Sequence, residues 1–116
     1  MSAMSREPAV DTIDLVFRDD AAREYLLVMV ETRRWSGTIS RMRELVKRVS
    51  AYVSFGLHQL HRHYPGTRGY KVTVRLDTLY EPDDPARRLL DRVGQAVQRM
   101  GLEFSVGPLQ DAFAVD

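Results

Sequence analysis

Residues 70–106, YKVTVRLDTLYEPDDPARRLLDRVGQAVQRMGLEFSV, decide the fold because they predict a strand, a helix and another strand in succession. Residues 70–80 alternate between apolar and polar side chains, which is the period of a strand with one buried face. Asp84 as N-cap and Pro85 in the first helical position predict the start of the helix, and Gly101 predicts its end. Residues 102–106 alternate again. A crossover of this kind is right-handed and makes its two strands parallel.

A long helix precedes this unit. Apolar residues recur at helical spacing between residues 39 and 64, after a candidate N-cap at Thr38 or Ser40 and before the helix breaker Pro65. Further apolar side chains lie beyond the edge of this stripe and widen the apolar arc to about 200°, roughly twice what packing on one sheet requires. They are Leu45, Tyr52 and Phe55.

Two strands come before the long helix. Six consecutive apolar residues, Tyr25 to Val30, predict a strand over residues 24–32 that is covered on both faces. Alternation over residues 10–17 predicts a second strand with one apolar face. The short connection between the two runs predicts a hairpin.

These elements predict an α/β (α+β) fold, a two-layer sandwich with the order ββαβαβ. Two right-handed crossovers place both helices on one face of a four-stranded mixed sheet. The chain length is typical of one domain. We expect a disordered N-terminus over residues 1–9, a single domain over residues 10–106 and a C-terminal tail over residues 107–116.

The predicted fold leaves more apolar surface than one copy can cover. The strand over residues 24–32 needs cover on both faces, and the long helix has a wider apolar arc than one sheet buries. A second copy packed on the open face accounts for both features, because monomers rarely expose large apolar patches. We therefore expect a homodimer. The alternative is that the tail, with Leu109, Phe113 and Val115, folds back over the open face.

Charge is unevenly distributed along the chain. Residues 33–75 carry ten basic side chains and one acidic side chain, whereas the flanking segments are both acidic, and the total is only +1. Such a segment attracts an anionic partner or is neutralised by its own flanks. As partner-binding residues on the long helix we expect the basic and apolar side chains of Arg41, Lys47, Arg48, Tyr52 and Phe55.

Several short segments resemble a family of small bacterial proteins catalogued only as a domain of unknown function. The resemblance extends over about residues 10–106 and implies a stand-alone bacterial domain, but it transfers no functional residues. The segments that carry it are Val10-Asp11-Thr12-Ile13-Asp14-Leu15-Val16, Val30-Glu31-Thr32-Arg33-Arg34-Trp35, Ala51-Tyr52-Val53-Ser54-Phe55, Arg75-Leu76-Asp77 and Tyr80-Glu81-Pro82.

One acidic pair is similar to the divalent-metal core of a nuclease superfamily. Asp14 lies on one predicted strand, and Glu31 with Arg33 ends the next. Carboxylates on adjacent strands can hold Mg²⁺, which activates water. Asp14 faces Glu31 only if residues 21–24 make the turn; with a turn over residues 19–22 it faces Leu27. Arginine is a poor substitute for the lysine of such sites. The simpler interpretation is a cross-strand charge cluster.

Three histidines at the end of the long helix are the other candidate metal ligands. His58 and His61 share a helix face, but His63 points elsewhere, and a metal needs three or four converging ligands. We therefore expect neither a metal nor a cofactor. Trp35, after two arginines, predicts either an aromatic anchor in a pocket or, as we prefer, a contact that fixes the loop to the core.

The remaining features favour a binding role. The chain has no cysteine, no apolar run long enough for a bilayer and no signal-peptide pattern, so we expect a cytoplasmic protein. We expect a non-enzymatic protein–protein interaction or accessory domain, homodimeric, with a basic helix face and an acidic protein partner. The alternatives are a metal-dependent nuclease using Asp14 and Glu31 with Arg33, or a nucleic-acid-binding module that uses the basic side chains on phosphates.

Overall fold

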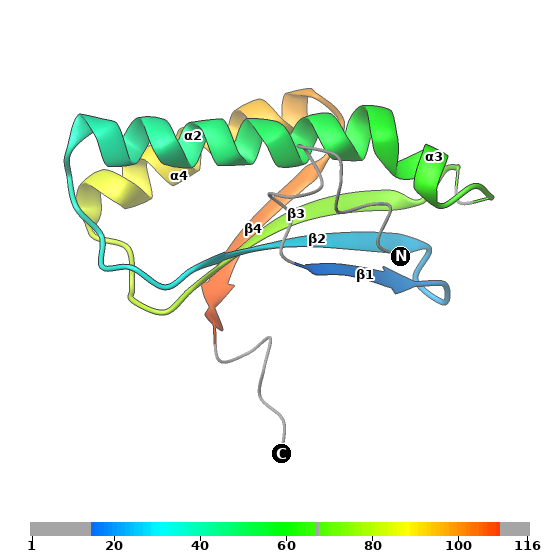
Figure 1. Ribbon diagram of the computed structural model, residues 1–116, viewed down its shortest axis with the longest axis horizontal. Helices are drawn as coiled ribbons and strands as arrows, with labels where there is room; N and C mark the ends of the chain where they lie inside the picture. Colours follow the sequence, from blue (N-terminus) through cyan, green and yellow to red (C-terminus); the bar gives the residue numbers. More distant parts are fainter. Residues whose placement is uncertain (1–14, 67, 110–116) are drawn as a thin grey trace, which may run out of the picture.

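The computed structural model describes residues 15–66 and 68–109, and within these ranges the chain forms a two-layer α+β fold (Figure 1). The sheet has the strand order β1-β2-β3-β4, and the long helical segment and α4 lie together on one face of it. The strands are β1 (Leu15–Asp19), β2 (Glu24–Glu31), β3 (Lys71–Thr78) and β4 (Glu103–Pro108). The helices are α2 (Ile39–Ser54), η2 (Phe55–Gln59), α3 (Leu60–His63) and α4 (Asp84–Arg99). The predicted fold class and element order are confirmed.

Two parallel pairings make the centre of the sheet. Strand β3 pairs with β2 from Glu24↔Lys71 to Glu31↔Thr78, and β4 pairs with β3 from Thr73↔Glu103 to Thr78↔Pro108. Both connections cross over the same face, as right-handed crossovers in one direction require. Strand β4 extends to Pro108, so the predicted boundary between domain and tail at residue 107 falls inside a strand.

The hairpin of β1 and β2 has a register that differs from both of the registers expected for Asp14, the one with a turn over residues 21–24 and the one with a turn over residues 19–22. Leu15 pairs with Val28 and Asp19 with Glu24, so the turn consists of residues 20–23. The turn over residues 21–24, which the facing of Asp14 and Glu31 required, is therefore wrong, because Glu24 belongs to β2. Asp14 itself lies outside the described residues, as do residues 1–9, Phe113 and Val115.

The long helical segment, which consists of α2, η2 and α3 in succession, contains one π-helical turn. Thr38 is the N-cap of α2, and its hydroxyl accepts a hydrogen bond from the backbone N–H of Arg41 at 3.4 Å. At η2 the pattern widens to i→i+5, which places an extra residue in the turn and rotates the following side chains. Gly56 lies in this turn against the sheet, where an added Cβ would lie 3.3 Å from Val72 and 3.4 Å from Leu27.

The buried stripe of this segment is rotated from the predicted one. Leu45 and Tyr52 are buried, whereas Ile39, Val46 and Leu57, which the periodicity placed in the stripe, are exposed. The Tyr52 hydroxyl donates to the Val28 carbonyl at 3.1 Å, which fixes this ring under the helix.

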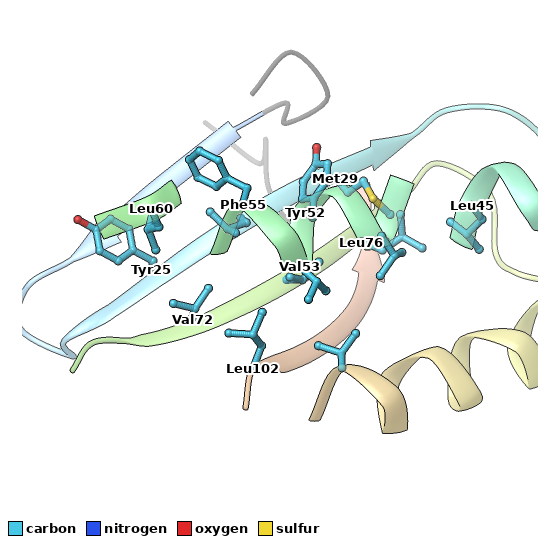
Figure 2. Close-up of a cluster of buried hydrophobic side chains, with 14 of the residues drawn as sticks. Tyr25, Met29, Leu45, Tyr52, Val53, Phe55, Leu60, Val72, Leu76 and Leu102 are labelled. Atoms are coloured by element: carbon cyan, nitrogen blue, oxygen red, sulfur yellow. The ribbon is translucent and has the colours of Figure 1, made fainter. Parts of the chain in front are cut away.

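The core lies between the helices and one face of the sheet (Figure 2). Figure 2 shows aromatic side chains of both layers, Tyr25 of β2 and Tyr52 and Phe55 of the helical layer, among aliphatic side chains of this cluster. Tyr25, Tyr52 and Phe55 are all fully buried, with aliphatic side chains of β3 beside them. Aromatic side chains of this size bury the largest apolar areas of any residue type. The main stabilisation of the fold therefore comes from this single cluster.

Alternate residues of β2 and β3 point to the other face of the sheet. Val28 pairs with Arg75 and Val30 with Asp77, so apolar side chains on β2 lie beside charged ones on β3. Asp77 is fully buried and forms an ion pair with Arg75 at 2.5 Å. The prediction that β2 is buried on both faces is confirmed at Val28, which is 1% exposed.

Helix α4 begins one residue earlier than predicted. Asp83, not Asp84, is the N-cap, and its carboxylate accepts a hydrogen bond from the backbone N–H of Ala86 at 3.0 Å. Pro85 is then the second helical residue. Gly101 has φ +94°, in the left-handed region that glycine adopts without strain after a helix, as predicted for its position.

The close approach at Gly56 gives a stability test. Gly56→Leu is expected to lower the free energy of unfolding by about 2 kcal/mol, because the side chain overpacks the contact with β2 and β3 even though leucine favours the helix. Gly37→Leu is the matched control, since no atom lies within 4 Å of a Cβ there. Urea denaturation of both variants measures the difference. Equal stability of the two would contradict the close packing of η2 on the sheet.

Candidate functional site

The predicted arginines gather around one buried carboxylate at the end of β2. The Glu31 carboxylate is almost fully buried, and Arg33 binds both of its oxygens, at 3.0 Å from Nε and 3.1 Å from Nη2. The backbone N–H of Arg33 donates to the same group at 2.9 Å. Arg48 lies 3.3 Å and Arg41 3.7 Å from it. We call these residues, with Glu44, the Glu31 cluster.

The rest of the cluster ties the helix to the strand. Arg33 also binds Glu44 on α2 at 2.6 Å, and Arg48 donates to the Val30 carbonyl at 3.0 Å. Arg41 donates to the Arg34 carbonyl at 3.0 Å. Arg41 and Arg48, predicted to bind a partner, are therefore engaged in holding α2 to the end of β2.

The charges of the cluster shift the pKa of Glu31. Burial raises the pKa of this carboxyl, but hydrogen bonds from the Arg33 side chain and backbone, with the charges of Arg33 and Arg48, outweigh burial and leave the pKa below its ordinary value. Hydrogen bonds from Glu31 and Glu44 raise the pKa of Arg33. The cluster is therefore an ion-pair network that is charged at neutral pH.

This arrangement does not favour the metal site that the nuclease hypothesis requires at Glu31. A divalent cation needs carboxylate oxygens that are open to it, and both oxygens of Glu31 accept hydrogen bonds from arginines. Three cations around one anion also repel a further cation. Within residues 15–66 and 68–109, no three acidic or histidine side chains converge as metal ligands. The cross-strand pairing with Asp14 lies outside the described residues.

Trp35 and the histidines have structural contacts. The Trp35 indole N–H donates to the Tyr80 carbonyl at 2.9 Å while its ring packs on the core, which confirms the prediction that it fixes the loop. His63 stacks on Phe55 with ring centroids 5.7 Å apart. Among the described residues, these histidines belong to no group of three side chains that could hold a metal ion.

Two of the predicted partner-binding residues are corrected by the structure. Tyr52 and Phe55 are both 0% exposed, because α2 and η2 turn them towards the sheet rather than towards solvent. Neither can form part of a binding surface in this fold. Lys47 is exposed on α2, as expected of a residue that contacts a partner.

The surface that the structure does offer is a groove of about 300 Å³ between the long helical segment and α4. Its lining is mainly apolar, and large side chains lie along it with small ones between them. Val46 is 40%, Leu57 38% and Met100 54% exposed. We define the groove by Val46, Val49, Ser50, Val53, Ser54, Leu57 and His58 on the first wall, and Val93, Ala96, Val97 and Met100 on the second.

Basic side chains flank the groove on both walls. On α2, Arg43 lies three residues before Val46, and Lys47 lies three residues before Ser50. On α4, Arg92 lies four residues before Ala96, and Arg99 three residues after it. Residues at these spacings are neighbours on a helix surface. All four basic side chains are exposed. The ion pairs between described residues involve none of these four side chains. We call Arg43, Lys47, Arg92 and Arg99 the basic rim.

Sequence reasoning missed most of this surface. Counting charge by segment placed α4 in an acidic region, but its acids lie near its start and at Asp91, which lines hollows on the side towards β4. The signal was present in α4, where Val93 and Met100 are seven residues apart and arginines recur beside them. Assigning each α4 residue to a face would have found it.

A larger hollow of about 570 Å³ lies where β3 and β4 end beside the start of α4. Its lining includes Glu81 with its partner Arg87, and also Pro108. Pro108 is the last residue of β4, and residues 110–116 beyond it lie outside the part of the chain that the structure describes.

Comparison with known proteins identifies the family. The chain belongs to the family of unknown function DUF6572, whose model matches residues 4–110. The resemblance to a family of unknown function that the short sequence segments indicated is thus confirmed over a longer range. No curated protein and no solved structure matches the chain significantly. None of the helices in the described ranges has the length and apolarity that crossing a bilayer requires.

The Glu31 cluster predicts a pH-dependent loss of stability. Because the folded-state pKa of Glu31 lies below its ordinary value, its contribution is present above the unfolded-state pKa and is lost as pH falls through the folded-state pKa. Glu31→Gln is expected to cost about 2 kcal/mol at pH 7, because charged hydrogen bonds are lost.

Urea denaturation at neutral pH and at about pH 3, below the ordinary glutamate pKa, measures this effect. The difference in the free energy of unfolding between the wild type and Glu31→Gln should be smaller at the lower pH. Glu81→Gln is the control, because Glu81 pairs with Arg87 at an exposed position. A gap that stays constant with pH would show that the carboxylate charge does not hold the cluster together.

Proposed function

We propose that this chain is a non-catalytic protein–protein interaction domain whose helical face binds a partner. The observation that carries the proposal is the groove, an apolar hollow of about 300 Å³ whose lining includes three partly exposed large apolar side chains. Exposed apolar side chains gathered in one concave surface mark interaction sites on soluble domains. The basic rim gives this surface a sign of charge that selects among partners.

The Glu31 cluster supports a non-catalytic role. Its arginines and its carboxylate satisfy one another, so the charged residues at the end of β2 act in holding α2 rather than in binding a substrate. Partner binding then takes place at the groove, on the side of α2 that faces away from the Glu31 cluster.

A nucleic-acid partner is less well matched to the groove. The basic rim could contact phosphates, but the floor between the walls is apolar, and a sugar–phosphate backbone has no apolar side chains to fill it. The predicted basic segment also loses Arg33, Arg41 and Arg48 to the Glu31 carboxylate. A protein surface offers both the apolar and the charged groups that the groove can bind.

Photo-crosslinking locates the contact. A photoreactive phenylalanine analogue at Ser50, which lines the groove, is expected to yield discrete adducts with a protein in cells that express the chain. The same analogue at Ser105, exposed and paired with Arg75 on the other face of the sheet, is the matched control and should give none of these partner adducts, although it can crosslink to a second copy of the chain. Equal adducts from both positions, or none from Ser50, would remove the groove as the binding surface.

The second role is self-association through the sheet. The face away from the helices carries Leu15, Phe17, Leu26 and Val30, of which Phe17 is 46% exposed beside its paired residue Leu26. Charges of both signs lie on this face, and Arg75 pairs with Asp77. A two-fold interface brings a patch against its own copy, which suits an apolar patch of mixed charge better than a uniformly basic one. We propose that a homodimer forms there.

Light scattering after size-exclusion chromatography tests the homodimer. The expected mass is twice the 13.3 kDa of the chain. Phe17→Glu is expected to give the mass of one chain, because a charge then lies in the apolar contact. Val46→Glu, in the groove, should leave the dimer intact. A wild-type mass of one chain at micromolar concentration would contradict the homodimer, and a monomer produced only by Val46→Glu would move it to the groove.

A further inference from the structure

We propose that the occupant of the groove is an acidic amphipathic α-helix of a partner protein. This inference rests on the proposed function, since it names the kind of partner that the same groove binds. Three features lead to it: the shape of the apolar floor, the absence of backbone partners in the walls, and the sign of the basic rim.

The apolar floor has the shape of a helix-binding surface. Val46, Val53 and Leu57 line one wall at intervals of seven and four residues, and Val93 and Met100 line the other at an interval of seven. From Val46 to Leu57 the wall is about 16 Å long at 1.5 Å per residue, which is about three turns of a bound helix. Apolar side chains at positions i, i+3, i+4 and i+7 of such a helix match a floor of this length.

Small side chains keep the groove open. Ser50 and Ser54 on the first wall and Ala96 on the second lie among the larger residues. Helices in direct contact pack 8–10 Å apart as a general rule, and small residues in such a seam leave room for side chains of a third helix. The groove can therefore accept leucine-sized side chains without movement of α2 or α4.

The walls favour a helix over an extended peptide. Both walls are helical, so their backbone N–H and C=O groups are bonded within the helices. An extended peptide would place its own backbone groups against an apolar floor with no partners, which is costly. A helix satisfies its own backbone and presents only side chains. This constraint decides between the two common modes of peptide recognition.

The basic rim sets the charge of the ligand. Arg43 and Lys47 flank one wall and Arg92 and Arg99 the other, and none is neutralised by another described residue. Glutamate or aspartate on both edges of the bound helix would meet these side chains. A second copy of this chain would instead bring an identical basic rim against them, and like charges across an interface oppose binding. An acidic partner is thus selected over self-association at this surface.

A display selection tests the ligand class directly. A library of random peptides of about 16 residues, each flanked by helix caps, is selected on the wild-type chain, with counter-selection on Ala96→Trp, in which an indole fills the groove. The enriched sequences are expected to be net negative, with apolar residues at i, i+3, i+4 and i+7. Circular dichroism and thermal melting of Ala96→Trp verify that the blocked variant keeps its fold. Ser50→Trp provides a second blocked variant if it does not.

Binding measurements on one enriched peptide complete the test. Fluorescence anisotropy should show affinity reduced about tenfold by Lys47→Glu with Arg92→Glu, and reduced by a similar factor as NaCl rises from about 50 mM to about 500 mM. The matched control is Arg87→Glu, on the side of α4 that faces the other hollow, which should leave affinity unchanged. Scrambling the peptide, so that its apolar residues no longer share a face, should abolish binding.

The outcomes separate this inference from the proposed function. The enriched peptides could depend on the groove but be basic, or their apolar residues could alternate with the period of a strand. Either result would overturn the proposal of an acidic helix while leaving the groove as a protein-binding surface. Duplex DNA could displace the enriched peptide from the wild-type chain and bind Ala96→Trp as tightly as the wild type. That result would show that the basic rim binds phosphates and not an acidic helix. A selection that yields only peptides insensitive to the blocked variants would contradict both the helix and the groove.

Discussion

The parallel pairing of β2, β3 and β4 is the constraint on which the rest of the structure depends. Each parallel pairing requires a crossover, and two right-handed crossovers in the same direction put both helices on one face. The aromatic core under α2 and η2 fixes the distance between the helices and the sheet. The helices then lie side by side, and the seam between them has no third layer of the described chain over it. The groove is thus a consequence of topology, and its chemistry is set by the residues that the sequence places along the seam.

The long helical segment performs two functions on opposite sides. Its sheet side carries Leu45, Tyr52 and Phe55 into the core, and its start is held by the Glu31 cluster. Its other side supplies Val46 and Leu57 to the groove. This division explains why its apolar arc is so wide in the sequence. It also explains the basic excess of this segment, because part of that charge neutralises Glu31 and part flanks the groove.

Much of the fold was predictable from local signals, and the candidate site was not. Alternation in β3, the helix start near Asp83 and the breaker at Pro65 gave the element order and the fold class, because each depends on neighbouring residues. The apolar stripe of the sequence did not show which side of its wide arc meets the sheet, so Tyr52 and Phe55 were expected outside, whereas both are fully buried. The π-turn over Phe55–Gln59 also gave no local signal, and it changes the direction only of the side chains that follow it. The ring of arginines around Glu31 joins residues far apart in the chain, and periodicity does not report such contacts. The α4 half of the basic rim is visible in the sequence only when each residue of α4 is assigned to a helix face.

The central claim is that the apolar seam between α2 and α4, and not the sheet, contacts the partner protein. Methyl NMR spectra recorded with and without a bound partner peptide measure this most directly. The account predicts that methyl resonances of Val46, Val53, Leu57, Val93 and Met100 shift on binding, whereas those of Leu26 and Val28 on the other face of the sheet do not. Shifts confined to Leu26 and Val28, with the groove methyls unchanged, would contradict it.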